Sequence, residues 1–77
     1  MITDWMVENG IAKNVFNANA IFNGLQLKGL TEKEQQARCT IYREWRRAGE
    51  NTRAAFAAAI KGENPPSRLI EVGNEQT

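Results

Sequence analysis

The sequence predicts an all-α fold, a small bundle of about four short helices in a single domain over residues 1–77. Six glycines divide the chain into short segments, and glycine is favoured just past a helix end because it adopts the left-handed conformation without strain. Within the segments, apolar residues recur at steps of three and four, which is the helical period. A composition of 42% hydrophobic and 25% charged residues is ordinary for a globular domain.

The first segment predicts a helix of about two turns that Gly10 closes. Thr3 is the expected N-cap, because a threonine hydroxyl can accept a hydrogen bond from a free backbone N–H of the first turn. Asp4 would then lie near the positive end of the helix dipole.

The second segment predicts a helix with one apolar stripe and an asparagine-rich opposite side. Asparagine side chains compete for backbone hydrogen bonds, so this helix is expected to depend on packing of its stripe. The stripe consists of Ile11, Val15, Ala18, Phe22 and Leu25.

The third segment predicts a helix over residues 32–48. Thr31 and Glu34 have the spacing of a capping box, in which each side chain bonds the backbone N–H of the other residue. The expected apolar stripe is Ala37, Ile41, Trp45 and Ala48, widened by Tyr42.

The fourth segment predicts an alanine-rich helix over residues 52–61, capped by either Asn51 or Thr52. The short connection makes residues 32–48 and 52–61 an antiparallel helical hairpin. Residues 66–77 are expected to form an extended C-terminal arm and tail, although part of this stretch is also compatible with a short strand or one more helical turn.

An enzyme is not expected, because the chain has no histidine and its single cysteine, Cys39, falls in mid-helix beside the apolar stripe. This thiol is expected to be buried and structural. We expect no metal and no cofactor, since the cysteine has no histidine partner and the glycines form no phosphate-binding loop. No apolar run approaches the roughly 20 residues that span a bilayer. A cytoplasmic protein without a membrane role is therefore predicted.

A protein-binding regulator is the first functional hypothesis. The helix that contains Phe56 is apolar on most sides, and further apolar residues lie off or beside the main stripes, namely Trp5, Met6, Phe16, Ile21 and Phe22. We therefore expect the chain to hold more apolar surface than a lone domain of this size can bury, and to self-associate or to bind a protein partner. Trp, Tyr and Arg dominate binding hot spots. The candidate partner-binding residues are Tyr42, Arg43, Trp45, Arg46, Arg47, Arg53 and Phe56.

The alternative is a small DNA-binding transcriptional regulator that uses the same arginines on phosphates. Two features weigh against it. The net charge is only +1, and the stretch from Ala54 to Ile60 offers methyl groups and a phenyl ring where a recognition helix needs polar side chains.

The stretch from Thr31 to Ile60, with its capped arginine-rich helix and alanine-rich partner helix, resembles the small helical accessory proteins of temperate phages and prophages. These include antirepressors, which bind and disable a repressor. The resemblance implies a homo-oligomeric helical protein that occupies or distorts a regulatory protein, and it assigns no individual residue.

Overall fold

The computed structural model describes residues 2–66, and within them the chain forms four α-helices and no strand. They are α1 (Ile2–Glu8), α2 (Val15–Gly24), α3 (Glu32–Arg47) and α4 (Thr52–Lys61). The predicted all-α fold with four short helices and a helical hairpin is confirmed. The predicted C-terminal arm lies, except for Pro66, outside the described residues.

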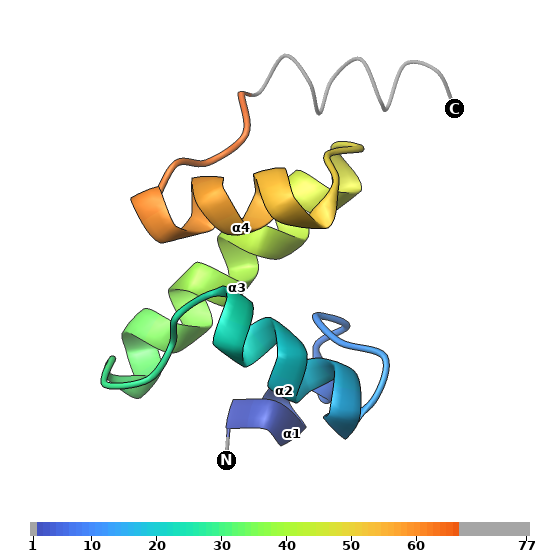
Figure 1. The fold of residues 1–77 in the computed structure, drawn as a ribbon, viewed down its shortest axis with the longest axis vertical. Helices are drawn as coiled ribbons and strands as arrows, with labels where there is room; N and C mark the ends of the chain where they lie inside the picture. Colours follow the sequence, from blue (N-terminus) through green and yellow to red (C-terminus); the bar gives the residue numbers. More distant parts are fainter. Residues whose placement is uncertain (1, 67–77) are drawn as a thin grey trace.

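The longest helix, α3, is the centre of the fold (Figure 1). Helix α4 follows it after a short turn and folds back over it, while α1 and α2 pack against each other and α1 also packs against α3 (Figure 1). Helix α3 therefore has neighbours on two sides, which decides which of its residues are buried.

Helix α1 ends as predicted but begins earlier. Its C-terminus has two closing hydrogen bonds, from the backbone N of Ile11 to the O of Met6 at 2.8 Å and from the N of Gly10 to the O of Val7 at 3.2 Å. These bonds require the left-handed conformation that Gly10 adopts, with φ of 71°. The prediction that Thr3 is the N-cap is wrong, because the helix already includes this residue and its side chain is buried.

Helix α2 begins later than the apolar stripe predicted. The side chain of Asn14 caps the helix by accepting a hydrogen bond from the backbone N of Asn17 at 2.7 Å, and Asn17 Oδ1 accepts one from the N of Lys13 at 3.1 Å. Ile11 therefore reaches the core from the preceding loop, and Val15 is 51% exposed. The predicted helix is wrong at Ile11 because Asn14 takes the cap position and the helix starts after it, and the predicted stripe is wrong at Val15, which is exposed.

The end of α2 also differs from the prediction. The predicted stripe runs to Leu25, whereas α2 ends at Gly24 with Leu25 as its C-cap, and the left-handed turn is made by Gln26, with φ of 55°. Gly24 has a different role. A Cβ atom at this position would overlap the ring of Phe56, so glycine is what allows α4 to approach α2 so closely.

Helix α3 begins with the predicted capping box. The backbone N of Glu34 donates to Thr31 Oγ1 at 3.2 Å, and the backbone N of Thr31 donates to Glu34 Oε1 at 3.1 Å. The helix runs to Arg47, with Ala48 as its C-cap, within one residue of the predicted end.

The buried face of α3 is displaced from the predicted stripe. Cys39 and Tyr42 are the buried residues, whereas Ala37 is exposed. The other three stripe residues, Ile41, Trp45 and Ala48, are half-buried. The reason is that α3 contacts neighbours on two sides, and periodicity along one helix reveals only a single apolar stripe.

Helix α4 is capped by Asn51, whose side chain accepts a hydrogen bond from the backbone N of Ala54 at 2.8 Å. This settles the choice between Asn51 and Thr52. Ala55 and Ala59 are buried, and such small side chains let helices pack closely. The ring of Phe56 stacks on that of Tyr42, with ring centroids 5.1 Å apart and planes at 22°.

The core draws on all four helices and on the loops before and after α2. The predicted burial of Cys39 is confirmed. None of the helices in the described part of the chain is long and apolar enough to cross a membrane. The buried hydrophobic residues are Ile2, Met6, Ile11, Ala12, Ala18, Ile21, Leu25, Leu27, Cys39, Tyr42, Ala55 and Ala59.

Candidate functional site

The three aromatic residues predicted to bind a partner make contacts within the chain. Tyr42 is 5% exposed and stacks on Phe56, which is half-buried. Trp45 is half-buried, and its Nε1 donates to the backbone O of Glu63 at 2.6 Å. These rings hold α3, α4 and the segment after α4 together, so Tyr42 is nearly enclosed and Trp45 and Phe56 are only partly available to another molecule.

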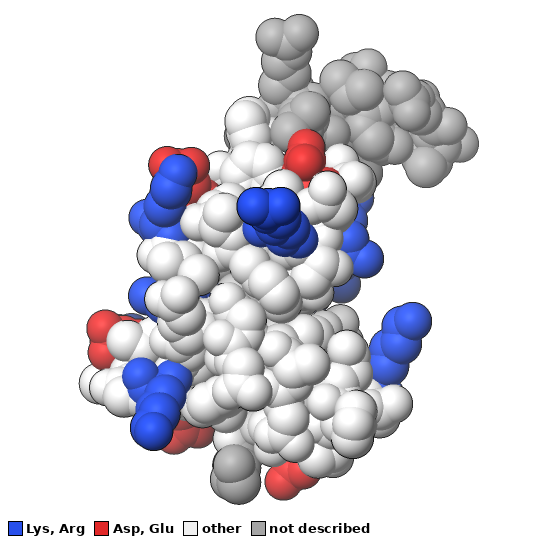
Figure 2. Space-filling view, viewed as in Figure 1, with Lys and Arg blue, Asp and Glu red and all other residues white. Residues whose placement is uncertain are grey.

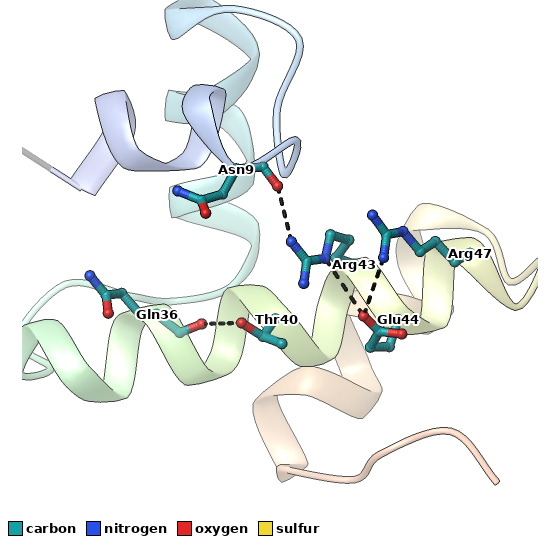
Figure 3. Close-up of polar contacts among 6 residues, drawn as sticks. All are labelled: Asn9, Gln36, Thr40, Arg43, Glu44 and Arg47. Atoms are coloured by element: carbon teal, nitrogen blue, oxygen red, sulfur yellow. Dashed lines mark hydrogen bonds and ion pairs between the residues drawn. The ribbon is translucent and has the colours of Figure 1, made fainter. Parts of the chain in front are cut away.

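Two arginines of α3 bind backbone carbonyl groups at the ends of other helices. Arg43 Nη1 donates to the O of Asn9 at 3.0 Å, just past α1 (Figure 3). Arg38 Nη1 donates in the same way to the O of Leu25 at 3.0 Å, at the end of α2. Helix ends leave carbonyl groups without partners, and a guanidinium group both satisfies them and complements the helix dipole. Part of the arginine cluster therefore supports the fold.

The hydrogen-bond donors of the Arg43 guanidinium group are only partly satisfied. Its Nε is buried and has no hydrogen-bond partner among the described residues. The nearest carboxylate is that of Glu44, with Oε1 at 3.6 Å from this Nε and 3.7 Å from Nη1 of Arg47 (Figure 3). Glu44 thus lies between two cations.

The remaining predicted contact residues, Arg46, Arg47 and Arg53, are exposed near the turn between α3 and α4. Arg46 Nη1 donates to the backbone O of Glu50 at 2.9 Å, and the side chain of Arg47 is 66% exposed. The three arginines are thus exposed near one turn, and Arg46 also lines a pocket with the buried ring of Tyr42.

A groove of about 580 Å³ lies between the α1–α2 loop, α2, α3 and the first residue of α4. Ile11, Ile21 and Tyr42 contribute apolar surface to it. Its polar lining residues are Lys13, Asn17, Arg43, Arg46 and Thr52. We call it the basic groove, because three of its lining residues are cationic and none is acidic.

The outer side of α2 is exposed and carries no charge. Phe16 is 88% exposed and Val15 51%. In Figure 2 the surface over α2 is an area without acidic or basic side chains, with charges around it. The exposed residues Val15, Phe16, Asn19, Ala20 and Asn23 form this surface, which we call the neutral face of α2.

Surplus apolar surface was expected on the helix with Phe56 and among further residues that include Phe16, whereas the large exposed hydrophobic residues in the described part of the chain are Val15 and Phe16. Lys13, Asn17 and Thr52 of the basic groove were not among the predicted contact residues. One signal for the neutral face exists in the sequence, because the stretch from Asn14 to Leu27 contains no charged residue. Nothing in the sequence predicts the groove, since it joins residues from four separate segments.

The thiol of Cys39 has no exposed surface, and burial raises its pKa to about 11. A thiol in this state is not a nucleophile at neutral pH, because the thiolate is the reactive form. Within residues 2–66 there is also no group of three or more His, Cys, Asp and Glu residues arranged to hold a metal ion.

Comparison with protein-family models, with curated protein sequences and with solved structures gives no significant match to this chain. The resemblance to phage accessory proteins therefore remains a prediction from the sequence.

Proposed function

We propose that this chain is a small regulatory protein-binding module whose contact surface is centred on the neutral face of α2. The observation that carries the proposal is the 88% exposure of Phe16. A single exposed aliphatic residue is common on soluble proteins, but here a phenyl ring is nearly free, has an exposed valine beside it and lies on a helix without any charge.

The energetics favour burial of this face by a partner. Transfer of a phenylalanine side chain out of water contributes roughly 1.5–3 kcal/mol, and no charged group on α2 would lose its hydration in the process. A specific interface buries about 800 Å² on each partner, whereas one phenylalanine supplies roughly 150–250 Å². An interface of that size would therefore extend from the neutral face to neighbouring surface. The basic groove adjoins the neutral face, because its lining residue Asn17 follows Phe16 on α2.

The exposed arginines near the α3–α4 turn, Arg46, Arg47 and Arg53, are candidates for the polar edge of this contact. Arg46 is the best placed, because it also lines the basic groove. The buried ring of Tyr42 would act indirectly, by holding α4 and the wall of the groove in place.

The test is capture of host proteins by the tagged chain, compared between wild type and Phe16→Ser. Because Phe16 is so exposed, its replacement should change the free energy of unfolding by no more than about 0.5 kcal/mol. The control is Lys33→Ser, which removes a long exposed side chain from α3. The proposal predicts a specific captured protein that is lost with Phe16→Ser and kept with Lys33→Ser. Equal capture by all three would refute it.

Self-association would use the same face. Two copies related by a two-fold axis would bring no like charges together there, since α2 has none. Light scattering should then give a mass that is a multiple of 8.7 kDa for the wild type and 8.7 kDa for Phe16→Ser. An identical mass for both variants would exclude this face as the self-association surface.

The regulatory part of the proposal follows the resemblance to antirepressors. It predicts that the captured partner is itself a DNA-binding regulator. Adding the chain to a complex of that regulator with its DNA should release the DNA, and Phe16→Ser should not. A ternary complex with the DNA retained would contradict an antirepressor role.

A DNA-binding regulator is the second candidate, and the exposure of Arg46, Arg47 and Arg53 near one turn favours it. It predicts binding to duplex DNA that weakens steeply with salt and with the double change Arg46→Ala and Arg47→Ala. Binding that is indifferent to salt, or absent, would exclude this candidate and leave the first one unaffected.

A further inference from the structure

The basic groove has an unbalanced charge. Lys13, Arg43 and Arg46 line it together with the hydroxyl-bearing Thr52, and no carboxylate is among its lining residues. Within the described residues, neither Lys13 nor Arg46 forms an ion pair, and Arg43 has only the carboxylate of Glu44 at 3.6 Å. Two of the three cations therefore have no ion-pair partner, and no carboxylate is in the lining, which produces a local positive potential.

One backbone feature adds to this potential. Thr52 is the first residue of α4, so the positive end of that helix dipole is at the groove. The carbonyl groups nearest to the arginines already accept hydrogen bonds, Asn9 O from Arg43 and Glu50 O from Arg46. Each of these bonds occupies one guanidinium nitrogen, and a guanidinium group has five N–H donors, so further donors remain for a ligand.

We propose that the basic groove binds a carboxylate group of the protein partner, so that the segment recognised by this chain is acidic and carries an apolar residue for the neutral face of α2. This inference rests on the proposed function and specifies the chemistry of the partner. Arginine and lysine bind carboxylates through short charge-assisted hydrogen bonds.

The shape of the groove favours a protein carboxylate over a nucleic-acid backbone. A duplex presents phosphates along a track, and proteins match it with cations spread over a face. Here the cations converge on one groove of about 580 Å³ that also has apolar surface from Ile21 and Tyr42. An acidic side chain flanked by apolar residues matches both parts of this lining.

The test uses a blocked peptide in which two glutamates flank a leucine, titrated into the isotope-labelled chain and followed by amide chemical shifts. The proposal predicts saturable shifts at Gly10, Lys13, Asn17 and Thr52, all of which line the groove. The isosteric glutamine peptide should bind at least about tenfold more weakly, the change expected when charge-assisted bonds are lost.

Arg46→Gln and Lys33→Gln form a matched pair of variants, because both residues are exposed cations of α3 but only Arg46 lines the groove. Arg46→Gln should weaken binding of the glutamate peptide about tenfold, and Lys33→Gln should leave it nearly unchanged. Equal effects of the two variants, or equal binding of the glutamate and glutamine peptides, would overturn the inference. Thermal unfolding of each variant controls for a loss of structure.

Inorganic phosphate and a short DNA duplex are titrated in the same way. Stronger binding of either than of the glutamate peptide, at the same groove residues, would overturn the assignment to a carboxylate. Failure of this inference is distinct from failure of the proposed function. If Phe16→Ser abolishes capture of the partner but the glutamate peptide causes no change in amide chemical shifts, the proposed protein-binding function is retained and the carboxylate site is refuted.

Discussion

The contact between Gly24 and Phe56 allows a direct test of how α2 and α4 pack. A methyl group on Gly24 would collide with ring atoms Cε2, Cζ and Cδ2 of Phe56, the last at 2.9 Å. Overpacking of this kind costs about 1–3 kcal/mol. The gain in helix propensity from Gly to Ala is at most about 1 kcal/mol, and it is smaller at the last residue of a helix. Gly24→Ala should therefore destabilise the fold, by about 1 kcal/mol.

A double-mutant cycle separates the collision from other effects of the substitution. Phe56→Leu removes the outer ring atoms, so Gly24→Ala in that background should be neutral or stabilising, and the two changes should couple by about 1 kcal/mol or more. Phe56→Leu alone destabilises the fold because it loses the stacking on Tyr42.

Urea unfolding followed by the fluorescence of the two tryptophans, Trp5 and Trp45, measures the free energy of unfolding of each variant. A loss of 1 kcal/mol lowers the melting temperature of a domain of this size by roughly 4–8 °C. Asn23→Ala is the control, because this neighbouring residue is exposed. Its effect on the free energy of unfolding should be the same with Phe or with Leu at position 56. If the effects of Gly24→Ala and Phe56→Leu are additive, the close approach of α4 to α2 is refuted.

Four other predictions concern local features. Thr31→Ala should cost about 0.5–2 kcal/mol by urea unfolding, because the capping box is lost; a neutral result would place the helix start elsewhere. The hydrogen bonds from Thr31 lower the pKa of Glu34 below its ordinary value of 4.5, so the stabilising effect is present above pH 4.5 and is lost as the pH falls through the lower pKa of the folded state. The stability difference between wild type and Glu34→Gln, measured from pH 7 to pH 3, should shrink accordingly. Gln26→Gly should stabilise the fold by about 0.5–1 kcal/mol in the same unfolding assay, since φ at this residue is 55°; a loss of stability would mean that the side chain makes a needed contact. Cys39, with its pKa raised to about 11, should react with a thiol reagent at pH 8 only as fast as the chain unfolds, and rapid reaction of the folded protein would contradict its burial.

The sequence was sufficient wherever a helix end depends on residues a few positions apart. The capping box of Thr31 and Glu34 and the left-handed Gly10 and Gly49 all lie within reach of their own helix ends, so local chemistry decides them. Where two local preferences competed, the sequence was less reliable. Asn14 was seen as part of a weak helical face, although its preference for the cap position moved the start of α2 past Ile11.

The buried faces and the surface site depended on contacts between distant parts of the chain. Arg43 was predicted to contact another protein, but it donates a hydrogen bond to the carbonyl group of Asn9, which is 34 residues away in the sequence. No local sequence pattern indicates this hydrogen bond. The same holds for Gly24, whose neighbour Phe56 is on another helix.

The sequence by itself determined an all-α chain, the approximate bounds of its helices and the burial of Cys39, because these follow from hydrogen bonding and apolar spacing over one or two helical turns. Only the tertiary structure decided that Val15 of the predicted stripe is exposed, that Cys39 and Tyr42 form the buried face of α3, and that Lys13 and Arg46 line one groove. The physical reason is that burial depends on which helix covers which side, and that choice is made by the packing of the whole chain.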